Sequence, residues 1–160
     1  NGPGCRASLD QGHGLLRVAI QWIEGAAAGA SPLLELLRRI QAKIERSSST
    51  TGHVGPIFGL AGAHLGLSAD ATVRVVGYCA ARDMVSAAVR LNLVGPMAGV
   101  SLLDRTQGAV DEGIRVALEE MPSRSAADPL AVVRNAATCS PIVEAVHPTH
   151  DMLALRLFRT

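Results

Sequence analysis

Apolar residues recur at helical spacing along most of this chain, and nowhere do they alternate convincingly with polar residues as in a β-strand. In residues 33–44 they fall every three or four positions and leave the opposite helix face charged. Aromatic residues make up only 2% of the 160 residues, so Ala, Leu, Val and Ile must form the core. Small aliphatic side chains favour packed helices over sheets. We therefore predict an all-α fold, a compact helical bundle in a single domain over residues 1–160.

Proline, serine and glycine mark where the predicted helices begin and end. Ser31 and Ser68 are placed as N-caps, and Pro96 suits the first turn of a helix. Gly108 and Gly113 predict a bend or break in the helix that contains them. The predicted helices cover about residues 9–24, 32–46, 56–66, 69–91, 96–121 and 129–139, with a last one opening at Thr149 or His150.

The charge balance argues against nucleic acid as a partner. Lysine and arginine number 15 against 14 aspartate and glutamate, a formal net charge of +1. Nucleic-acid-binding domains usually carry a basic patch. The basic residues at 38–39 and 43–46 are interleaved with glutamates, so we expect a solvated helix face there. The longest apolar run, Val54–Leu67, is shorter than a bilayer span and predicts a buried core helix with no membrane contact.

The cysteines and glycines point to no catalytic or nucleotide site. Cys5, Cys79 and Cys139 are too widely spaced for a disulfide framework or a zinc site, which favours a reducing compartment such as the cytoplasm. Cys79 is expected in the core. The glycine-rich stretch 52–59 lacks the lysine of a phosphate-binding loop. No nucleophile lies in a recognisable motif with a base, so we expect no enzyme activity and no intrinsic cofactor.

The histidines give only weak metal candidates. His147 and His150 are three residues apart, which on a helix would place both on one face. Pro148 between them disfavours a regular helix, so a permanent metal site is not expected, although imidazole suits transient contact with nickel. His53 and His64 lie in an apolar stretch and are expected to be hydrogen-bonded core residues.

Three charged residues interrupt an otherwise apolar helix. Arg82, Asp83 and Arg90 are expected to be exposed, because an unpaired buried charge is costly. Arg82 and Asp83 are neighbours in sequence and are not expected to face each other. The alternative is that these charges line a partner interface or a polar path between helices.

The last eleven residues, His150–Thr160, are unusual for a chain end. Chain ends usually fray and carry little apolar content. Here Leu157 and Phe158 lie between Arg156 and Arg159, close to the terminus. Such a tail predicts docking, either on its own protein or on a partner.

Four short blocks, in order along the chain, resemble the urease accessory protein UreF family. They are Ser8-x-x-Gln-Gly12 with Leu15-Leu16, His53 ahead of Pro56-Ile-Phe-Gly-Leu60, Val85–Met97 with a plant-type Asn-Leu-Val-Gly-Pro, and His150-Asp-x-x-x-x-Arg-Leu-Phe-Arg-Thr160. In the last block the family commonly has Glu at Asp151 and Ser at Leu155 and Thr160. The family's N-terminal region, a glycine-rich segment leading into His-Ser-x-Gly-Leu-Glu, has no counterpart. We therefore expect the C-terminal portion of a UreF-like domain, with some apolar surface exposed.

The resemblance implies a non-catalytic scaffold for nickel delivery. UreF-type proteins are all-α homodimers that bind UreD (also called UreH) and with it recruit the GTPase UreG to apo-urease. Nickel would then be a transient cargo, and GTP would belong to the partner GTPase. The alternative is a generic α-helical interaction adaptor unrelated to nickel.

The resemblance also assigns partner-binding residues. Arg90 occupies a basic position that bears on GTPase recruitment or the nickel path, and we expect it to pair with a carboxylate. Residues 147–160 are expected to form a partner-docking tail. In this tail His150 would belong to the surface that meets the GTPase, and Asp151 would be a further partner-binding residue. Leu157 and Phe158 would be apolar anchors, with Arg156 as a charge-assisted hydrogen-bond donor.

Overall fold

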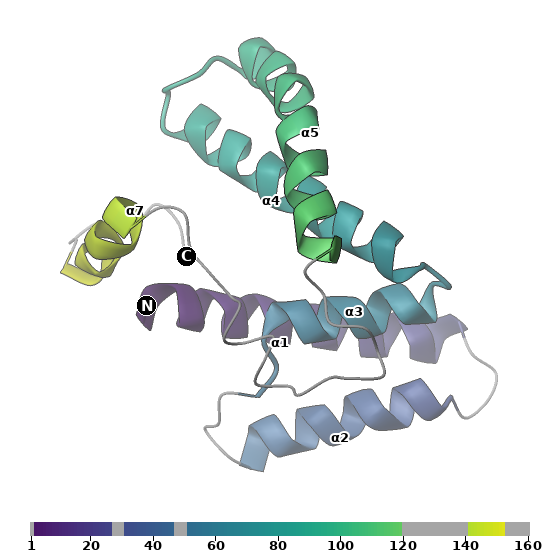
Figure 1. Cartoon of the computed structure of the whole chain (residues 1–160). Coiled ribbons are helices and arrows are strands. Elements are labelled where there is room, and N and C mark those ends of the chain that lie inside the picture. Colours follow the sequence, from purple (N-terminus) through teal and green to yellow (C-terminus); the bar gives the residue numbers. More distant parts are fainter. Residues whose placement is uncertain (1, 27–30, 47–50, 120–140, 153–160) are drawn as a thin grey trace. The chain divides into compact units, whose positions relative to one another are not determined.

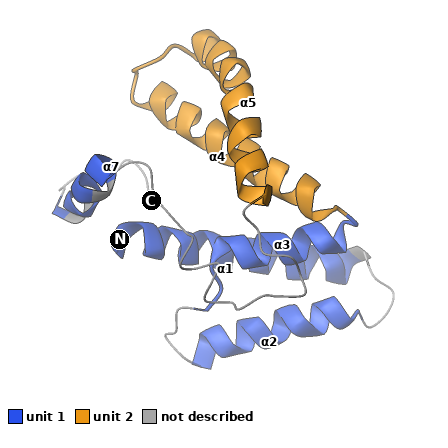
Figure 2. Ribbon diagram, in the orientation of Figure 1, with its two compact units in different colours: residues 1–66, 138–160 blue, residues 67–137 orange. Residues whose placement is uncertain are grey.

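The computed structural model describes residues 2–26, 31–46, 51–119 and 141–152, and it places no strand among them. The predicted all-α class is confirmed (Figure 1). The helices group into two compact units, unit 1 (Asn1–Gly66 with Thr138–Thr160) and unit 2 (Leu67–Ala137), coloured separately in Figure 2. The elements are α1 (Gly2–Ala26), α2 (Pro32–Arg46), α3 (Val54–His64), α4 (Ala69–Arg90), α5 (Pro96–Glu119), α7 (Pro141–Val146) and the 3-10 helix η1 (His147–Met152).

The capping residues start their helices as predicted. The Ser31 carbonyl accepts a hydrogen bond from the Glu35 amide at 3.1 Å, which opens α2. The Ser68 hydroxyl accepts one from the Ala71 amide at 3.1 Å and so satisfies an otherwise unpaired donor in the first turn of α4. Helix α5 begins at Pro96. In each case the signal is local, so the sequence alone was sufficient to place the start.

Other boundaries differ from the prediction. Helix α1 begins at Gly2 rather than near residue 9, since Pro3 fits the first turn of a helix, where its missing N–H is not needed. Helix α5 runs unbroken through Gly108 and Gly113, so the predicted break is wrong. The cost of about 1 kcal/mol per glycine is outweighed by packing along the rest of α5. The helix predicted at 129–139 lies outside the described residues.

The end of the described chain is also different. An α-helix over Pro141–Val146 leads directly into the 3-10 helix His147–Met152, so no α-helix opens at Thr149 or His150. Pro148 lacks the N–H that an α-helix would use, and the tighter 3-10 turn accommodates it. The Thr149 hydroxyl donates to the Val146 carbonyl at 2.7 Å and closes the junction between the two elements.

Unit 1 is built around α1, which packs against both α2 and α3. The buried residues of this core are Leu16, Ala19, Ile20, Ile23, Leu37 and Ile57. Their spacing on α1 gives one apolar stripe, as helical periodicity requires. Helix α3 buries only Ile57 and Gly62, so the stretch predicted as a buried core helix packs on one face only. His64 is exposed rather than in the core, with its ring 5.9 Å from that of Trp22 in an edge-on arrangement.

Unit 2 is a hairpin in which α4 packs against α5. Ala81 and Ile114 are its buried apolar residues within the described part of the chain, and Cys79 is only half-buried. Glycines bring the two helices close together, because a Cβ at Gly77 would lie 2.9 Å from the Ile114 Cδ1 and one at Gly99 2.8 Å from the Val89 Cγ2. Helices α4 and α5 are therefore held together by close contacts at these glycines.

Candidate functional site

Two of the motif blocks meet where α1 contacts the segment that leads into α3. The Ser8 hydroxyl and the His53 Nδ1 form a hydrogen bond of 3.1 Å. A Cβ on Gly12 would overlap the Gly52 carbonyl and lie 2.7 Å from the Val54 nitrogen, so only glycine fits there. We call this contact the α1–α3 junction. The junction gives a physical reason for Ser8 and Gly12 in the first motif block and for His53 in the second. It also confirms His53 as a hydrogen-bonded residue.

A second histidine, His13 on α1, makes a further hydrogen bond at the same junction. His13 Nε2 lies 3.1 Å from the Thr51 carbonyl oxygen. A carbonyl can only accept, so Nε2 must carry the proton and donate it. Both histidines are half-buried, and both of their hydrogen bonds join α1 to residues 51–53. The junction positions α1 for the pocket described below.

The Val85–Met97 block forms the turn between α4 and α5. Asn92 adopts φ 57°, the left-handed conformation that ends a helix. The amide of Leu93 donates to the Ala88 carbonyl at 3.0 Å, and the amide of Asn92 donates to the Val89 carbonyl at 3.0 Å. These two bonds form a Schellman motif, in which asparagine takes the place usually held by glycine. The turn therefore accounts for the Asn in the block.

Arg90 lies in the last turn of α4, directly before this turn, and is exposed as predicted. Arg82 and Asp83 are exposed too, but the prediction that they do not face each other is wrong. Arg82 Nη2 lies 2.8 Å from Asp83 Oδ1, because the long arginine side chain folds back over its neighbour. This hydrogen-bonded carboxylate raises the pKa of Arg82.

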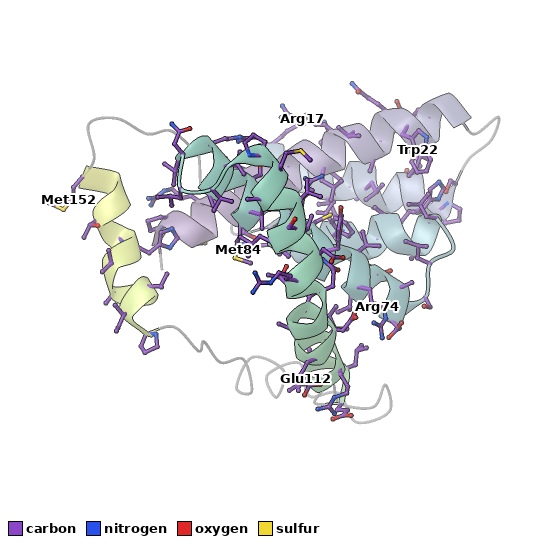
Figure 3. All side chains as sticks on the ribbon, turned by 90° about the horizontal axis from the view of Figure 1, so that it is seen from above. Arg17, Trp22, Arg74, Met84, Glu112 and Met152 are labelled. Atoms are coloured by element: carbon purple, nitrogen blue, oxygen red, sulfur yellow. The ribbon has the colours of Figure 1, made fainter. Side chains whose placement is uncertain are left out.

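Large apolar side chains stay exposed along unit 2. They include Leu93, Met97 and Val100, which are 74%, 82% and 67% exposed. Met84 on α4 is exposed too and is labelled in Figure 3. Between α4 and α5 runs an apolar groove of about 420 Å³. Its lining residues are Ala81, Met84, Val85, Ala88, Leu102, Thr106, Ala109 and Val110. The expected exposure of apolar surface is thus observed, and it is suited to binding a protein rather than to chemistry.

The predicted metal candidates and tail residues lie in or after η1, which contacts α1. His147 is half-buried in the first turn of η1, and the backbones of His150 and Asp151 belong to the same element. Arg156, Leu157 and Phe158 lie outside the described residues. Over the part of the chain that the structure describes, no three His, Cys, Asp or Glu side chains are grouped to hold a metal ion. The docking tail therefore stays a prediction.

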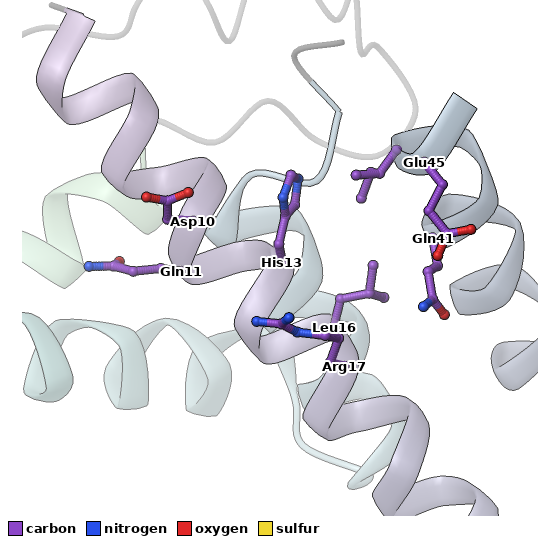
Figure 4. Close-up of a pocket in the computed structure, with 8 residues that line it drawn as sticks. Asp10, Gln11, His13, Leu16, Arg17, Gln41 and Glu45 are labelled. Carbon is purple, nitrogen blue, oxygen red and sulfur yellow. The ribbon is translucent and has the colours of Figure 1, made fainter. Parts of the chain in front are cut away.

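A pocket in unit 1 was not predicted (Figure 4). It has a volume of about 620 Å³ and lies between α1 and the C-terminal half of α2. Its lining residues are Asp10, Gln11, His13, Leu16, Arg17, Gln41, Ile44 and Glu45. The helical spacing of Asp10, His13 and Arg17 was the signal that could have indicated a polar stripe on α1. The contribution of α2 could not be read from that spacing.

Among the described helices, none is sufficiently long and apolar to cross a bilayer. Comparison with known proteins identifies the chain more closely. The UreF family model matches residues 5–107. Urease accessory protein F from Arabidopsis thaliana is 33% identical over 155 residues, covering 96% of this chain and 56% of that protein. The proteins of the same name from Oryza sativa subspecies indica and japonica are 31% identical, covering 97% of this chain and 52% of theirs.

The chain thus spans about half the length of the curated relatives it matches. No solved structure matches it significantly. The relatives are named accessory proteins rather than enzymes, which agrees with the expected non-catalytic role. The matched region contains the α1–α3 junction and the α4–α5 turn, the two places where the motif residues have a clear structural purpose. Because the match covers well over half of its residues, the chain belongs to the UreF family.

Proposed function

We propose that this chain is part of a non-catalytic scaffold for assembly of the urease metallocentre. In this role it binds UreD (UreH), and the two together recruit the GTPase UreG so that nickel reaches apo-urease. Family membership and the name of the relatives, urease accessory protein F, support the role. The structural observation that carries it is the exposed apolar surface of unit 2 around the α4–α5 turn.

This surface has the composition of a protein-binding site. Leu93 and Met97 are largely exposed beside the turn, and Arg90 is exposed directly before it. Interfaces combine apolar anchors with arginine, which donates several hydrogen bonds to a carboxylate. The Schellman motif holds the turn in one conformation, so little ordering entropy is lost when a partner binds. We assign the contact with the GTPase or with UreD to this end of the hairpin.

The chemistry of the proposed role belongs to the partners. Nickel passes as a transient cargo, and GTP binds to UreG, so this chain needs neither a resident cofactor nor a catalytic group. The proposed form is a homodimer in the cytoplasm. Residues 147–160 add a docking segment, with His150 and Asp151 on its surface and Arg156, Leu157 and Phe158 as its contacts.

Co-purification with UreD and UreG, scored together with nickel-dependent urease activation, tests the proposal. We expect Arg90→Glu to reduce both the co-purification and the urease activation about tenfold, the effect of losing a charged hydrogen bond at an interface. Arg105→Glu is the matched control, because Arg105 is an exposed arginine of the same unit away from the turn. Circular dichroism establishes that both variants stay helical. Activation that is unchanged in Arg90→Glu would refute the assigned contact.

The docking tail is tested separately by ending the chain after Thr149. The shortened protein should lose co-purification with its partners while its helical content falls only slightly. Full retention of binding would remove the tail from the proposed interface and leave the role of unit 2 intact.

A further inference from the structure

The pocket between α1 and α2 has the features of a built binding site (Figure 4). Its volume of about 620 Å³ falls within the range of roughly 300–1,000 Å³ found for ligand sites. Leu16 and Ile44 give it an apolar floor, and polar side chains of both helices surround them. An apolar base with a few polar groups is the usual composition of a recognition pocket.

The floor and one wall are fixed by the core of unit 1. Leu16 is 2% exposed and belongs to the buried cluster, and Ile44 packs against that cluster. His13 is held by the Thr51 carbonyl, and the neighbouring Gly12 by its close contact with Gly52. A site on two helices that are locked in this way needs little rearrangement to bind.

Opposite charges line the pocket without neutralising each other. Arg17 on α1 and Glu45 on α2 have no hydrogen bond or ion pair with any residue that the structure describes. The same two helices do form such a pair elsewhere, between Arg38 and Glu24 at 2.7 Å. The hydrogen-bonding capacity of Arg17 and Glu45 therefore remains available at the pocket, together with the amide of Gln41.

We propose that this pocket binds an extended segment of a partner protein that carries an acidic side chain, an apolar side chain and a basic side chain in succession. The acidic group pairs with Arg17, the apolar group covers Leu16 and Ile44, and the basic group pairs with Glu45. The Gln41 amide suits a peptide main chain, which offers donors and acceptors together. This inference rests on the proposed scaffold function and adds to it a second partner contact, separate from the α4–α5 turn.

Short overlapping peptides that tile UreD, UreG and the urease subunits provide the probe. Fluorescence anisotropy measures the binding of each peptide to the whole chain. We expect binding by at least one peptide with the acidic, apolar and basic pattern, weakened about tenfold by Arg17→Glu and by Glu45→Arg. Lys43→Glu is the control, because Lys43 is an exposed charge of α2 that does not line the pocket. It should bind like the unaltered chain.

A charge-inverted peptide makes the test independent of any loss of folding. The double variant Arg17→Glu with Glu45→Arg should regain binding only to the peptide whose acidic and basic residues are exchanged. If either single variant unfolds, Arg17→Gln and Glu45→Gln replace the reversals. The proposal is overturned if no peptide binds the unaltered chain, or if the pocket variants bind as the Lys43 control does.

Failure of the pocket and failure of the scaffold function give different results. If the unaltered chain co-purifies with UreD and UreG but the pocket variants bind every peptide normally, the scaffold stands and the pocket proposal is overturned. If the unaltered chain captures neither partner, the scaffold function itself fails, and with it the reason to expect a partner segment in this pocket.

Discussion

Units 1 and 2 use similar aliphatic residues in opposite ways. In unit 1, three helices enclose one continuous core, and four large side chains of α1, α2 and α3 are almost completely buried. In unit 2, two helices meet along a line of small residues, while methionine, leucine and valine side chains face outward. Unit 1 is thus stabilised by its own buried core, whereas unit 2 leaves apolar surface exposed to water, where a partner can cover it.

The largest effect is expected for the core of unit 1. Leu37 is 0% exposed, so Leu37→Ala should lower the free energy of unfolding by about 2–5 kcal/mol. The neighbouring Leu36 is 42% exposed, and Leu36→Ala should cost less than about 1 kcal/mol. Urea denaturation followed by circular dichroism measures both. Equal losses would mean that α2 does not bury the face described here.

The close backbone contact at the α1–α3 junction gives the next largest effect. Gly12→Ala should destabilise unit 1 by about 1–3 kcal/mol, because the added methyl group meets main-chain atoms that cannot rotate away. Gly14→Ala on the same helix has open space and should stabilise it by about 0.5–1 kcal/mol. Thermal unfolding of the two variants should therefore shift in opposite directions. A stable Gly12→Ala protein would contradict the tight junction.

A matching glycine in unit 2 should matter less. A Cβ at Gly77 meets the Ile114 Cδ1 at 2.9 Å and the Val110 Cγ1 at 3.0 Å, which are ends of side chains. These can shift, and alanine also favours the helix, so Gly77→Ala should cost about 1 kcal/mol or less. Gly108→Ala, with open space around it, is the control. Amide hydrogen exchange in α4 and α5 measures the change, and a loss as large as that at Gly12 would remove the contrast between the units.

The smallest effect concerns pH at the end of α5. The hydrogen-bonded Arg115 guanidinium holds the pKa of Glu112 below its ordinary value. A carboxylate with a lowered pKa in the folded state stabilises at neutral pH, and this contribution is lost as the pH falls through that lowered pKa. The effect is slight because both side chains are exposed. NMR titration should show the pKa of Glu112 rising toward its usual range in Arg115→Gln, and an unchanged titration would exclude the pairing.

Local signals predicted much of the fold. Ser31, Ser68 and Pro96 each mark a helix start through interactions with residues at most four positions away. The contacts that could not be predicted join distant parts of the chain. Nothing near Gly12 in the sequence reveals that the backbone at Gly52 lies against it. The Arg82–Asp83 pair was missed for another reason, since helical spacing ignores how far an arginine can fold back.

Of the two candidate sites, the surface at Arg90 could be predicted from the sequence and the pocket could not. The exposure of Arg90 followed from its charge in an apolar helix, and the family resemblance drew attention to its block. The pocket combines Arg17 with Glu45, which come from different helices, and neither belongs to a motif. Such a site becomes visible only when the packing of α1 on α2 is known.

One consequence of the edge-on contact between Trp22 and His64 is optical. The chain has a single tryptophan and a single tyrosine, and Trp22 lies in unit 1 whereas Tyr78 lies in unit 2. The indole of Trp22 changes its surroundings when α1 and α3 separate, so its emission reports whether the two helices remain in contact. Indole can be excited selectively at the red edge of its absorption band, where the phenol of Tyr78 does not absorb and therefore does not fluoresce. The melting of unit 1 can therefore be followed through Trp22, separately from the melting of unit 2 and without any label.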